Sequence, residues 1–445
     1  MQQELSVSYK RIWLIAYPII IGSIAQNVIN VTDTAFLGRL GEVALGGGAI
    51  GGLFYLSIVM LGWGFGIGTQ IVVARRFGEG AVRAIGRTVE HGLLFLLGLA
   101  LAILLLVLAF KDDFLRLIIS SDEVRYTSID FVNYRIWGIF FAHANFIFRA
   151  LYIGIGKTKV ITLTTLVMVV INIFLDYSLI FGHFGFPEMG VSGAALASVV
   201  AEISCTIVFL VFTYAKLPVN DYRLFRFKLF SSKLLVRLLK VSVPMMFQNF
   251  FSFAVWFVFF LLIEKMGESE LAVSNIIRSV YVVLLIPIMG FASATNSLVS
   301  YVIGKGYQNQ VFRVITKTSV ISVLGVTAIV AVCSLFPKQL LMVYTTNSHL
   351  IELGVPAIRV ISVSAVLLAL AFVLFSGVSG TGKTNVSLFI EMLVLFLYLI
   401  LTYVLASVLR AEVHVVWSVE IFYGFFMSLL SYLYLKSGRW KGENV

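Results

Sequence analysis

The sequence predicts an all-α membrane protein of twelve transmembrane helices arranged in two six-helix lobes. Three observations lead to this prediction. First, 60% of the residues are hydrophobic and only 12% are charged, which excludes a soluble globular domain. Second, apolar runs long enough to cross a hydrocarbon core of about 30 Å recur along the whole chain. Third, the second half of the chain repeats the first at a constant offset of 226 residues.

The apolar runs define the expected helices. A helix rises about 1.5 Å per residue, so roughly twenty residues are needed for one crossing. In chain order the predicted spans are residues 12–38, 46–74, 88–110, 124–148, 160–182, 191–214, 238–264, 273–302, 314–336, 350–376, 386–406 and 413–436.

Lysine and arginine fall unevenly between the predicted loops. One alternating set of loops holds 23 of them and the other set holds 7. The positive-inside rule therefore places both termini in the cytoplasm, in a multi-pass protein of the inner or plasma membrane. The N-terminal stretch MQQELSVSYKR shows no cleavable signal pattern, so we expect the first helix to remain in the mature protein.

The internal repeat defines the expected domains. Its identical pairs include Pro18/Pro244, Gly41/Gly267, Glu42/Glu268, Tyr55/Tyr281, Gly64/Gly290, Gly156/Gly382 and Lys157/Lys383. Six spans in each half give both halves the same orientation, related by a pseudo-two-fold axis along the membrane normal. We therefore expect an N-terminal lobe of residues 1–215, a cytoplasmic interlobe linker of residues 216–237 and a C-terminal lobe of residues 238–445.

The first span carries a carboxylate inside the membrane. Gln26, Asn30 and Asp33 follow one another at i, i+4 and i+7, which places them on one helical face. An ionisable residue within a membrane helix indicates a functional site, because exposing a charge to lipid costs several kcal/mol. The alternative is that Asp33 lies close enough to the outer helix end to be wetted by headgroups.

Further polar residues are expected at the depth of Asp33. Asn172 and Asp176 lie one turn apart in the fifth span, and Ser198 and Glu202 lie one turn apart in the sixth. Carboxylates packed together in an apolar site resist joint ionisation, so at least one should hold a proton or a cation. The alternative is a set of unconnected interhelical hydrogen bonds.

The other buried charges are harder to place from the sequence. Arg135 in the fourth span is expected either to pair with these acids or to extend to the membrane surface. In the second half, Glu264 and Glu391 lie near predicted helix ends and are expected at the interface. Glu420 lies deeper, but the sequence gives it no partner, so the second lobe is expected to hold less buried acid than the first.

Two glycine-rich segments and two prolines have structural interpretations. Gly377–Thr384 matches the phosphate-loop pattern, but it joins two membrane spans instead of a strand and a helix, so we expect a tight turn and no bound nucleotide. Its repeat copy, Gly154–Lys159, lacks the first glycine of that pattern. Pro18 and Pro244 remove a hydrogen bond from the first helix of each lobe and are expected to bend it.

Several of these segments together resemble the multidrug and toxic compound extrusion (MATE) family. They are the stretch near Gly38–Gly47, the GIGKTK turn, NIFLDYSLIFG (Asn172–Gly182) and MGVSGAALAS (Met189–Ser198). The aspartate in the first helix and the Asn-x-x-x-Asp of the fifth are similar to the DinF-like branch. The resemblance implies that Asp33, Asn172 and Asp176 carry the coupling ion, H⁺ or Na⁺, and that Ser198 supplies a hydroxyl.

The NorM-like branch of the same family is expected to hold a second set of acids. They would be a glutamate eight residues after the proline of the seventh helix and an acid in the tenth. Here Ser252 follows Pro244 by eight residues, and the tenth span has no acid after Glu352. The sequence therefore does not support a sodium site of that kind in the C-terminal lobe.

The resemblance implies an antiporter that exports organic, cationic compounds by alternating access. Candidate substrate contacts are Gln26, Asn30, Phe36, Arg135 and Glu202. The main alternative is a flippase for lipid-linked sugars, which would need the arginines Arg135, Arg278 and Arg359 to bind pyrophosphate. We expect a monomer in the lipid bilayer, with small organic cations or drugs as partners. We expect no enzyme activity and no cofactor besides the coupling ion. We also expect no nucleic-acid partner, because the basic residues lie in short loops and act as topology signals.

Overall fold

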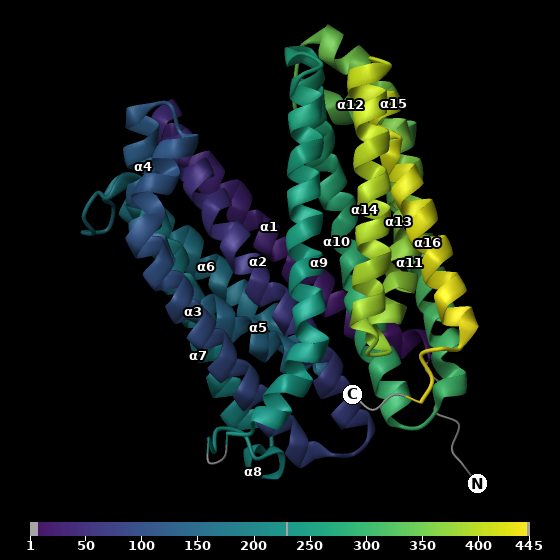
Figure 1. The fold of residues 1–445 in the computed structure, drawn as a ribbon. Coiled ribbons are helices and arrows are strands. Elements are labelled where there is room, and N and C mark those ends of the chain that lie inside the picture. Colours follow the sequence, from purple (N-terminus) through teal and green to yellow (C-terminus); the bar gives the residue numbers. More distant parts are fainter. Residues whose placement is uncertain (1–7, 228–229, 443–445) are drawn as a thin grey trace. The chain divides into compact units, whose positions relative to one another are not determined.

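The computed structural model describes residues 8–227 and 230–442, and within these ranges the regular structure is entirely helical (Figure 1). Twelve of its helical segments are long and apolar enough to cross a membrane, which confirms the predicted fold class. In a bilayer every backbone polar group needs an internal partner, and a helix supplies one along its length. The expectation of an uncleaved N-terminus concerns residues that lie mostly outside the described ranges.

The helices of the first half follow the predicted spans, and most of them extend beyond the predicted ends. They are α1 (Tyr9–Leu40), α2 (Glu42–Gly78), α3 (Val82–Ile118), α4 (Asp122–Arg135), a 3₁₀ turn (Ile136–Gly138), α5 (Ile139–Gly154), α6 (Lys159–Phe181), α7 (Gly190–Lys216) and the short α8 (Val219–Tyr222). The predicted fourth span is therefore two helices joined by a 3₁₀ turn.

The second half repeats this order. Its elements are α9 (Ser232–Glu264), α10 (Glu268–Gly304), a 3₁₀ turn (Gln308–Gln310), α11 (Val311–Leu335), α12 (Pro337–Met342), α13 (Ser348–Gly380), α14 (Thr384–Tyr403) with a π turn (Val404–Val408), α15 (Val413–Trp417) and α16 (Val419–Ser437).

The helices form two compact units. The first unit is Ile21–Met246, and the second unit combines Met1–Ile20 with Phe247–Val445. The boundaries thus fall inside α1 and α9, shortly after Pro18 and Pro244, at equivalent points of the repeat. This division differs from the expected lobes because the first part of α1 packs with the second half of the chain, and the first part of α9 with the first half.

Repeat-related glycines make this exchange of helix segments possible. In the second unit, Gly290 of α10 packs directly on Ile20 of α1. In the first unit, the equivalent Gly64 of α2 packs on α9, where a Cβ would lie 2.5 Å from Met245 O and from Met246 Cα. Small residues allow helix backbones to approach closely in membranes.

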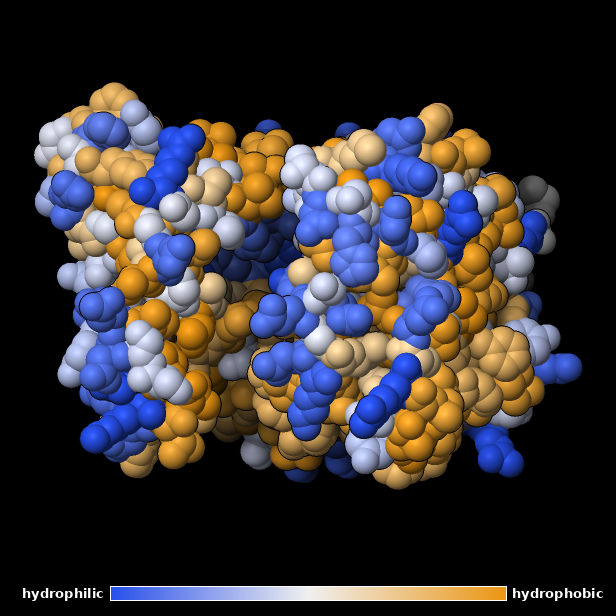
Figure 2. Space-filling view, turned by 90° about the horizontal axis from the view of Figure 1, so that it is seen from above, coloured by the Kyte–Doolittle hydropathy of each residue, from blue (hydrophilic) through white to orange (hydrophobic). Residues whose placement is uncertain are grey.

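Each unit is built around one deeply buried span. In the apolar stretches of α4–α5 and α13, 72% and 61% of the residues are buried. Helix α5 packs against α2, α3 and α7, while α13 packs against α10, α11 and α16. Figure 2 views the end that carries α4 and α12, where hydrophilic residues gather and hydrophobic residues occupy much of the flanks. Spans 4 and 10 are equivalent in the repeat, so the repeat extends to the core.

The two glycine-rich segments that contain a lysine, Gly154–Lys159 and Gly377–Thr384, form turns between helices. Gly156 and Gly382 have φ values of 72° and 93°, a left-handed conformation that glycine adopts without strain. The Lys157 N–H donates to Tyr152 O at 2.9 Å and closes the first turn. Both segments therefore join helix to helix, as the sequence predicted, and neither has the strand that a phosphate-binding loop requires.

The linker after α7 is anchored to the buried end of α3. Glu90 Oε1 accepts from the backbone N–H of Arg226 at 2.6 Å, and His91 Nε2 accepts from that of Ser231 at 2.9 Å. Both side chains are almost fully buried. This part of the linker is thus fixed by hydrogen bonds to the first unit.

Candidate functional site

Two aspartates of the first unit meet between α1 and α6. The carboxyl groups of Asp33 and Asp176 lie within hydrogen-bonding reach of each other. Asp176 and Asn172 are fully buried one turn apart on α6, while Asp33 is half-buried. With its nitrogen turned toward the acids, the Asn172 amide donates to Asp33 Oδ1 at 3.2 Å and to Asp176 Oδ2 at 3.3 Å. These three predicted residues therefore form one cluster.

The cluster cannot carry two full negative charges at low cost. Two carboxylates in contact repel each other, and burial removes the water that would screen them. A hydrogen bond between two carboxyl groups also requires a proton on one of them. Asp176 Oδ1 is buried and has no hydrogen-bond partner. The geometry is therefore that of a pair that shares a proton or holds a small cation.

Arg135 and Glu202 form a second polar group beside this pair. Arg135 Nη1 donates to Glu202 Oε2 at 2.8 Å, and Nη2 donates to Oε1, which gives a two-pronged ion pair. The side chains are only 12% and 14% exposed. The charge of Arg135 also acts on Asp33. Of the two positions expected for Arg135, the structure has the paired one, with Glu202 as its partner.

The ion pair depends on neighbours that the sequence did not indicate. Gly138, in the 3₁₀ turn after α4, leaves the space that the pair occupies, since a Cβ there would lie 2.5 Å from both side chains. The centroid of the Tyr55 ring lies 3.8 Å from the Arg135 guanidinium carbon. Asn145 Nδ2 donates to Glu202 O at 3.0 Å, and Asn145 Oδ1 accepts from Thr206 Oγ1 at 2.9 Å. In the sequence, the signals for these neighbours were the repeat identity of Tyr55 with Tyr281 and the polarity of Asn145 and Thr206 within apolar spans.

The remaining predicted residues lie apart from these groups. Gln26 and Asn30 are exposed on α1, and Phe36 packs its ring against Tyr177 and Phe181 of α6. Ser198 is half-buried on α7, one turn before Glu202. Within the described chain it forms no hydrogen bond with the aspartate cluster.

The second unit contains more buried acid than the sequence predicted. Glu391 and Glu420 are 2% and 3% exposed. The expected interfacial position of Glu391 was wrong, because α14 begins at Thr384 and places this residue two turns inside the helix, against α9 and α16. Glu420, for which the sequence offered no partner, accepts hydrogen bonds from Tyr281 and Tyr398.

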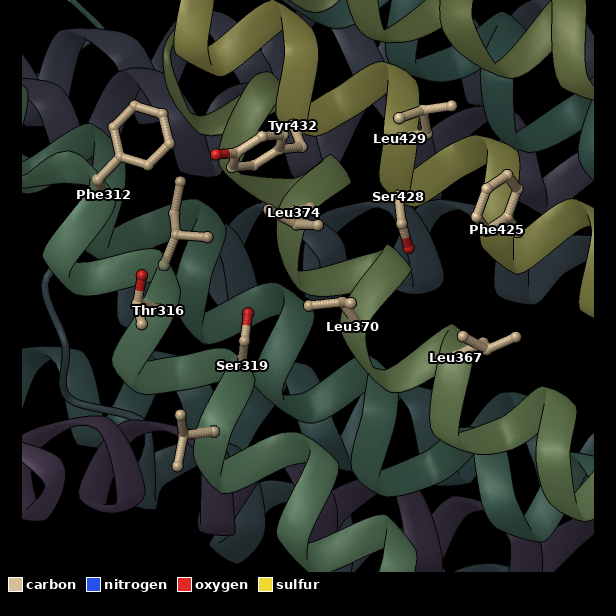
Figure 3. Close-up of a pocket in the computed structure, with 12 residues that line it drawn as sticks. Phe312, Thr316, Ser319, Leu367, Leu370, Leu374, Phe425, Ser428, Leu429 and Tyr432 are labelled. Atoms are coloured by element: carbon tan, nitrogen blue, oxygen red, sulfur yellow. The ribbon is translucent and has the colours of Figure 1, made fainter.

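A separate cavity of about 550 Å³ opens between α11, α13 and α16 of the second unit. Figure 3 shows that mainly apolar side chains, among them leucines and phenylalanines, line it together with Thr316, Ser319 and Ser428. It contains no acidic or basic side chain among its lining residues. In the described part of the chain, no group of three or more His, Cys, Asp or Glu side chains is placed to hold a metal ion.

The comparison with protein families agrees with the repeat. The MatE family model matches the chain twice, over residues 18–178 and 244–404, which begin 226 residues apart. The chain belongs to the MATE family. It is therefore a multi-pass membrane transporter and not an enzyme.

Curated relatives and solved structures extend this finding. The chain is 25% identical over its whole length to 96% of a probable multidrug resistance protein NorM of Thermotoga maritima. It is 24% identical, over 79% of the chain, to 78% of a protein of the same name from Synechocystis.

Two solved structures have a similar fold. The first is the outward-facing structure of a multidrug resistance MATE family transporter of the MOP superfamily. It has a TM-score of 0.89 and 21% identity, over 98% of this chain and 97% of that one. The second is a MOP superfamily transporter from Pyrococcus furiosus, with a TM-score of 0.87 and 21% identity over 96% and 95% of the two chains. At this identity the likeness establishes the fold alone.

Proposed function

We propose that this transporter is a multidrug efflux antiporter that exchanges protons for organic cations by alternating access. The observation that carries the proposal is the buried contact between Asp33 and Asp176. Such a pair can release a bound cation when it takes up a proton, because the added proton cancels the negative charge that attracts the cation. The names of the relatives, which are multidrug resistance proteins, support drugs as the class of substrate.

The proton is the better candidate for the coupling ion. With the Asn172 nitrogen facing the acids, the amide donates to both carboxylates and leaves one shared proton as the missing element. The hydrogen-bonding contact between Asp33 and Asp176 also requires a proton on one of the two carboxyl groups, which supports a proton over sodium. Ser198 remains a proposed accessory hydroxyl, half-buried on α7. Coupling in the N-terminal lobe is the feature that the DinF-like resemblance implied.

A cationic substrate is favoured over an anionic one. The charge of Arg135 is already compensated by Glu202, so it does not cancel the charge of the aspartate pair. A flippase for pyrophosphate-linked sugars would need this arginine to be available, and its ion pair with Glu202 disfavours that alternative. We propose the exposed Gln26 and Asn30, together with Phe36, as substrate contacts on α1.

The proposed cycle uses the thermodynamic linkage between binding of the proton and binding of the organic cation. With cytoplasmic termini, protons arrive at the aspartate pair from outside and lower its affinity for the organic cation. Reciprocity requires that the cation lowers the affinity for protons by the same factor. Helices α1 and α9 run through the boundaries of the units next to Pro18 and Pro244, which makes them the proposed moving elements.

The decisive experiment measures ethidium transport in proteoliposomes under separately imposed pH and Na⁺ gradients. We expect a pH gradient alone to drive transport, and Asp33→Asn to lower the driven rate by about tenfold or more, within the usual range of coupling free energies. Asp130→Asn, which alters an exposed aspartate of α4, is the matched control and should leave the rate unchanged. Full gradient-driven transport by Asp33→Asn would contradict the proposal.

A further inference from the structure

The second unit contains a buried acidic network of its own. Glu391 Oε1 accepts from Ser252 Oγ of α9 at 2.7 Å and from the Tyr423 hydroxyl of α16 at 2.9 Å. Glu420 accepts from the Tyr398 hydroxyl at 2.9 Å and from the Tyr281 hydroxyl at 2.8 Å. The network therefore joins four helices: α9, α10, α14 and α16.

The two acids are linked crosswise by tyrosines on α14 and α16. Glu391 and Tyr398 lie two turns apart on α14, so they share a face, and Glu420 and Tyr423 lie one turn apart on α16. Each acid bonds to the tyrosine of the opposite helix. The two tyrosine rings are 6.0 Å apart between centroids. The acids and tyrosines thus form a continuous group along about 10 Å of helix, at 1.5 Å per residue.

This network lies at the repeat equivalent of the aspartate site. At the offset of 226 residues, Tyr398 corresponds to Asn172, which bonds both aspartates, and Tyr281 corresponds to Tyr55, which covers Arg135. Both units therefore carry buried carboxyl groups at corresponding places in the fold. The residues that bear the carboxyl groups differ, and the donor at the shared position is an amide in Asn172 and a hydroxyl in Tyr398.

In the part of the chain that the structure describes, no positively charged side chain compensates these acids. In the described ranges the polar groups that bond to them are Ser252 and the tyrosines, and Ser252 Oγ also donates to the backbone oxygen of Gln248. No lysine, arginine or histidine there pairs with either one. Glu391 Oε2 and Gln248 Oε1 are buried without a hydrogen-bond partner. A buried carboxylate with neutral donors alone and one unpaired oxygen is costly, and a protonated carboxyl group costs less because it carries no net charge.

We propose that Glu391 is a second exchangeable proton site, in the second unit, with Glu420 joined to it through Tyr423 and Tyr398. The proton binds Glu391 Oε2, the oxygen that has no partner. This adds one proton to the cycle proposed above for the aspartate pair. The site itself stands on its own geometry, so it can be tested without any transport measurement.

The first test is an infrared pH titration of the purified protein in lipid, which reports the carbonyl stretch of protonated carboxyl groups. Glu391→Gln should remove one titrating band, and Asp33→Asn should leave that band in place. Tyr423→Phe should shift its frequency, because it removes a hydrogen bond to Glu391 Oε1. Glu352→Gln, which alters an exposed acid of α13, is the matched control and should change nothing.

The second test counts protons. In proteoliposomes the number of protons exchanged per ethidium should fall about twofold in Glu391→Gln, as expected when one of two linked protons is lost. A Glu391→Gln spectrum that superimposes on the wild type would overturn the proposal, as would a band that responds to Na⁺ and not to pH. If Glu391→Gln does not fold, an unshifted band in Tyr423→Phe is the result that overturns it. Loss of transport in Asp33→Asn with the Glu391 band intact separates the two sites.

Discussion

The two units stabilise buried acid in different ways. In the first unit, Glu202 is held by the guanidinium of Arg135, so a full positive charge compensates it. In the second unit, Glu420 accepts hydrogen bonds from the neutral hydroxyls of Tyr281 and Tyr398. An ion pair stays charged over a wide pH range, whereas a carboxyl group among hydroxyls can gain or lose a proton. The first arrangement suits a fixed structural element, and the second suits proton exchange.

This difference arises although the backbone repeats closely. Gly64 and Gly290 both receive a helix from the other half of the chain, and Gly156 and Gly382 both form left-handed turns. Steric requirements of this kind tolerate only glycine, so both copies keep it. Polar partners are not constrained in this way, because one acid can be stabilised by several kinds of donor. The repeat therefore predicts where a polar site lies, and the side chains decide its chemistry.

The largest expected effect comes from breaking the ion pair of the first unit. Arg135→Gln leaves Glu202 as a buried, uncompensated charge, which should lower the free energy of unfolding by about 3–5 kcal/mol. Thermal unfolding in detergent, followed by tryptophan fluorescence, measures it. The double variant Arg135→Gln with Glu202→Gln should recover most of the loss, since it leaves no buried charge. Equal stability of the single variant and the wild type would show that the pair is not a fixed structural element.

A smaller effect is expected from crowding the same ion pair. In Gly138→Ala the new Cβ would lie 2.5 Å from Arg135 Nη1 and Glu202 Oε2, so the pair must shift. Overpacking of this kind costs about 1–3 kcal/mol. Gly98→Ala in α3 is the matched control, because a Cβ there meets nothing within 4 Å. The same unfolding measurement should show a lower free energy of unfolding for Gly138→Ala and not for Gly98→Ala. Equal values for the two variants would mean that the ion pair moves aside at no cost.

The sequence predicted the helices and the aspartate cluster because both depend on local patterns. Apolar length defines a span, and Asn172 and Asp176 share a face by their spacing alone. The contact of these residues with Asp33 was predicted from the estimated depth of each side chain in the membrane. Because the membrane is thin, side chains on different helices have only a narrow range of possible depths. These predictions needed only the helix rise and the direction of each span.

The rest of the site depends on rotation and packing, which the sequence does not specify. Glu391 seemed interfacial because it follows a lysine turn, but the rotation of α14 directs it toward Ser252 and Tyr423. The ion pair of Arg135 with Glu202 required knowing that a glycine leaves space between α4 and α7. The unit boundaries inside α1 and α9 likewise reflect contacts between segments far apart in the chain.

The finest test compares the repeat-equivalent tyrosines directly. Tyr281→Phe removes a 2.8 Å hydrogen bond to Glu420, and no cation replaces it. The free energy of unfolding should therefore fall by about 1–3 kcal/mol. Tyr55→Phe removes a hydroxyl that lies 3.5 Å from Glu202, a carboxylate already held by Arg135. Its cost should stay below about 1 kcal/mol, because a bond of that length is weak. If both variants lose the same stability, the charge of Arg135 does not substitute for a hydroxyl donor, and the two units would stabilise acid alike.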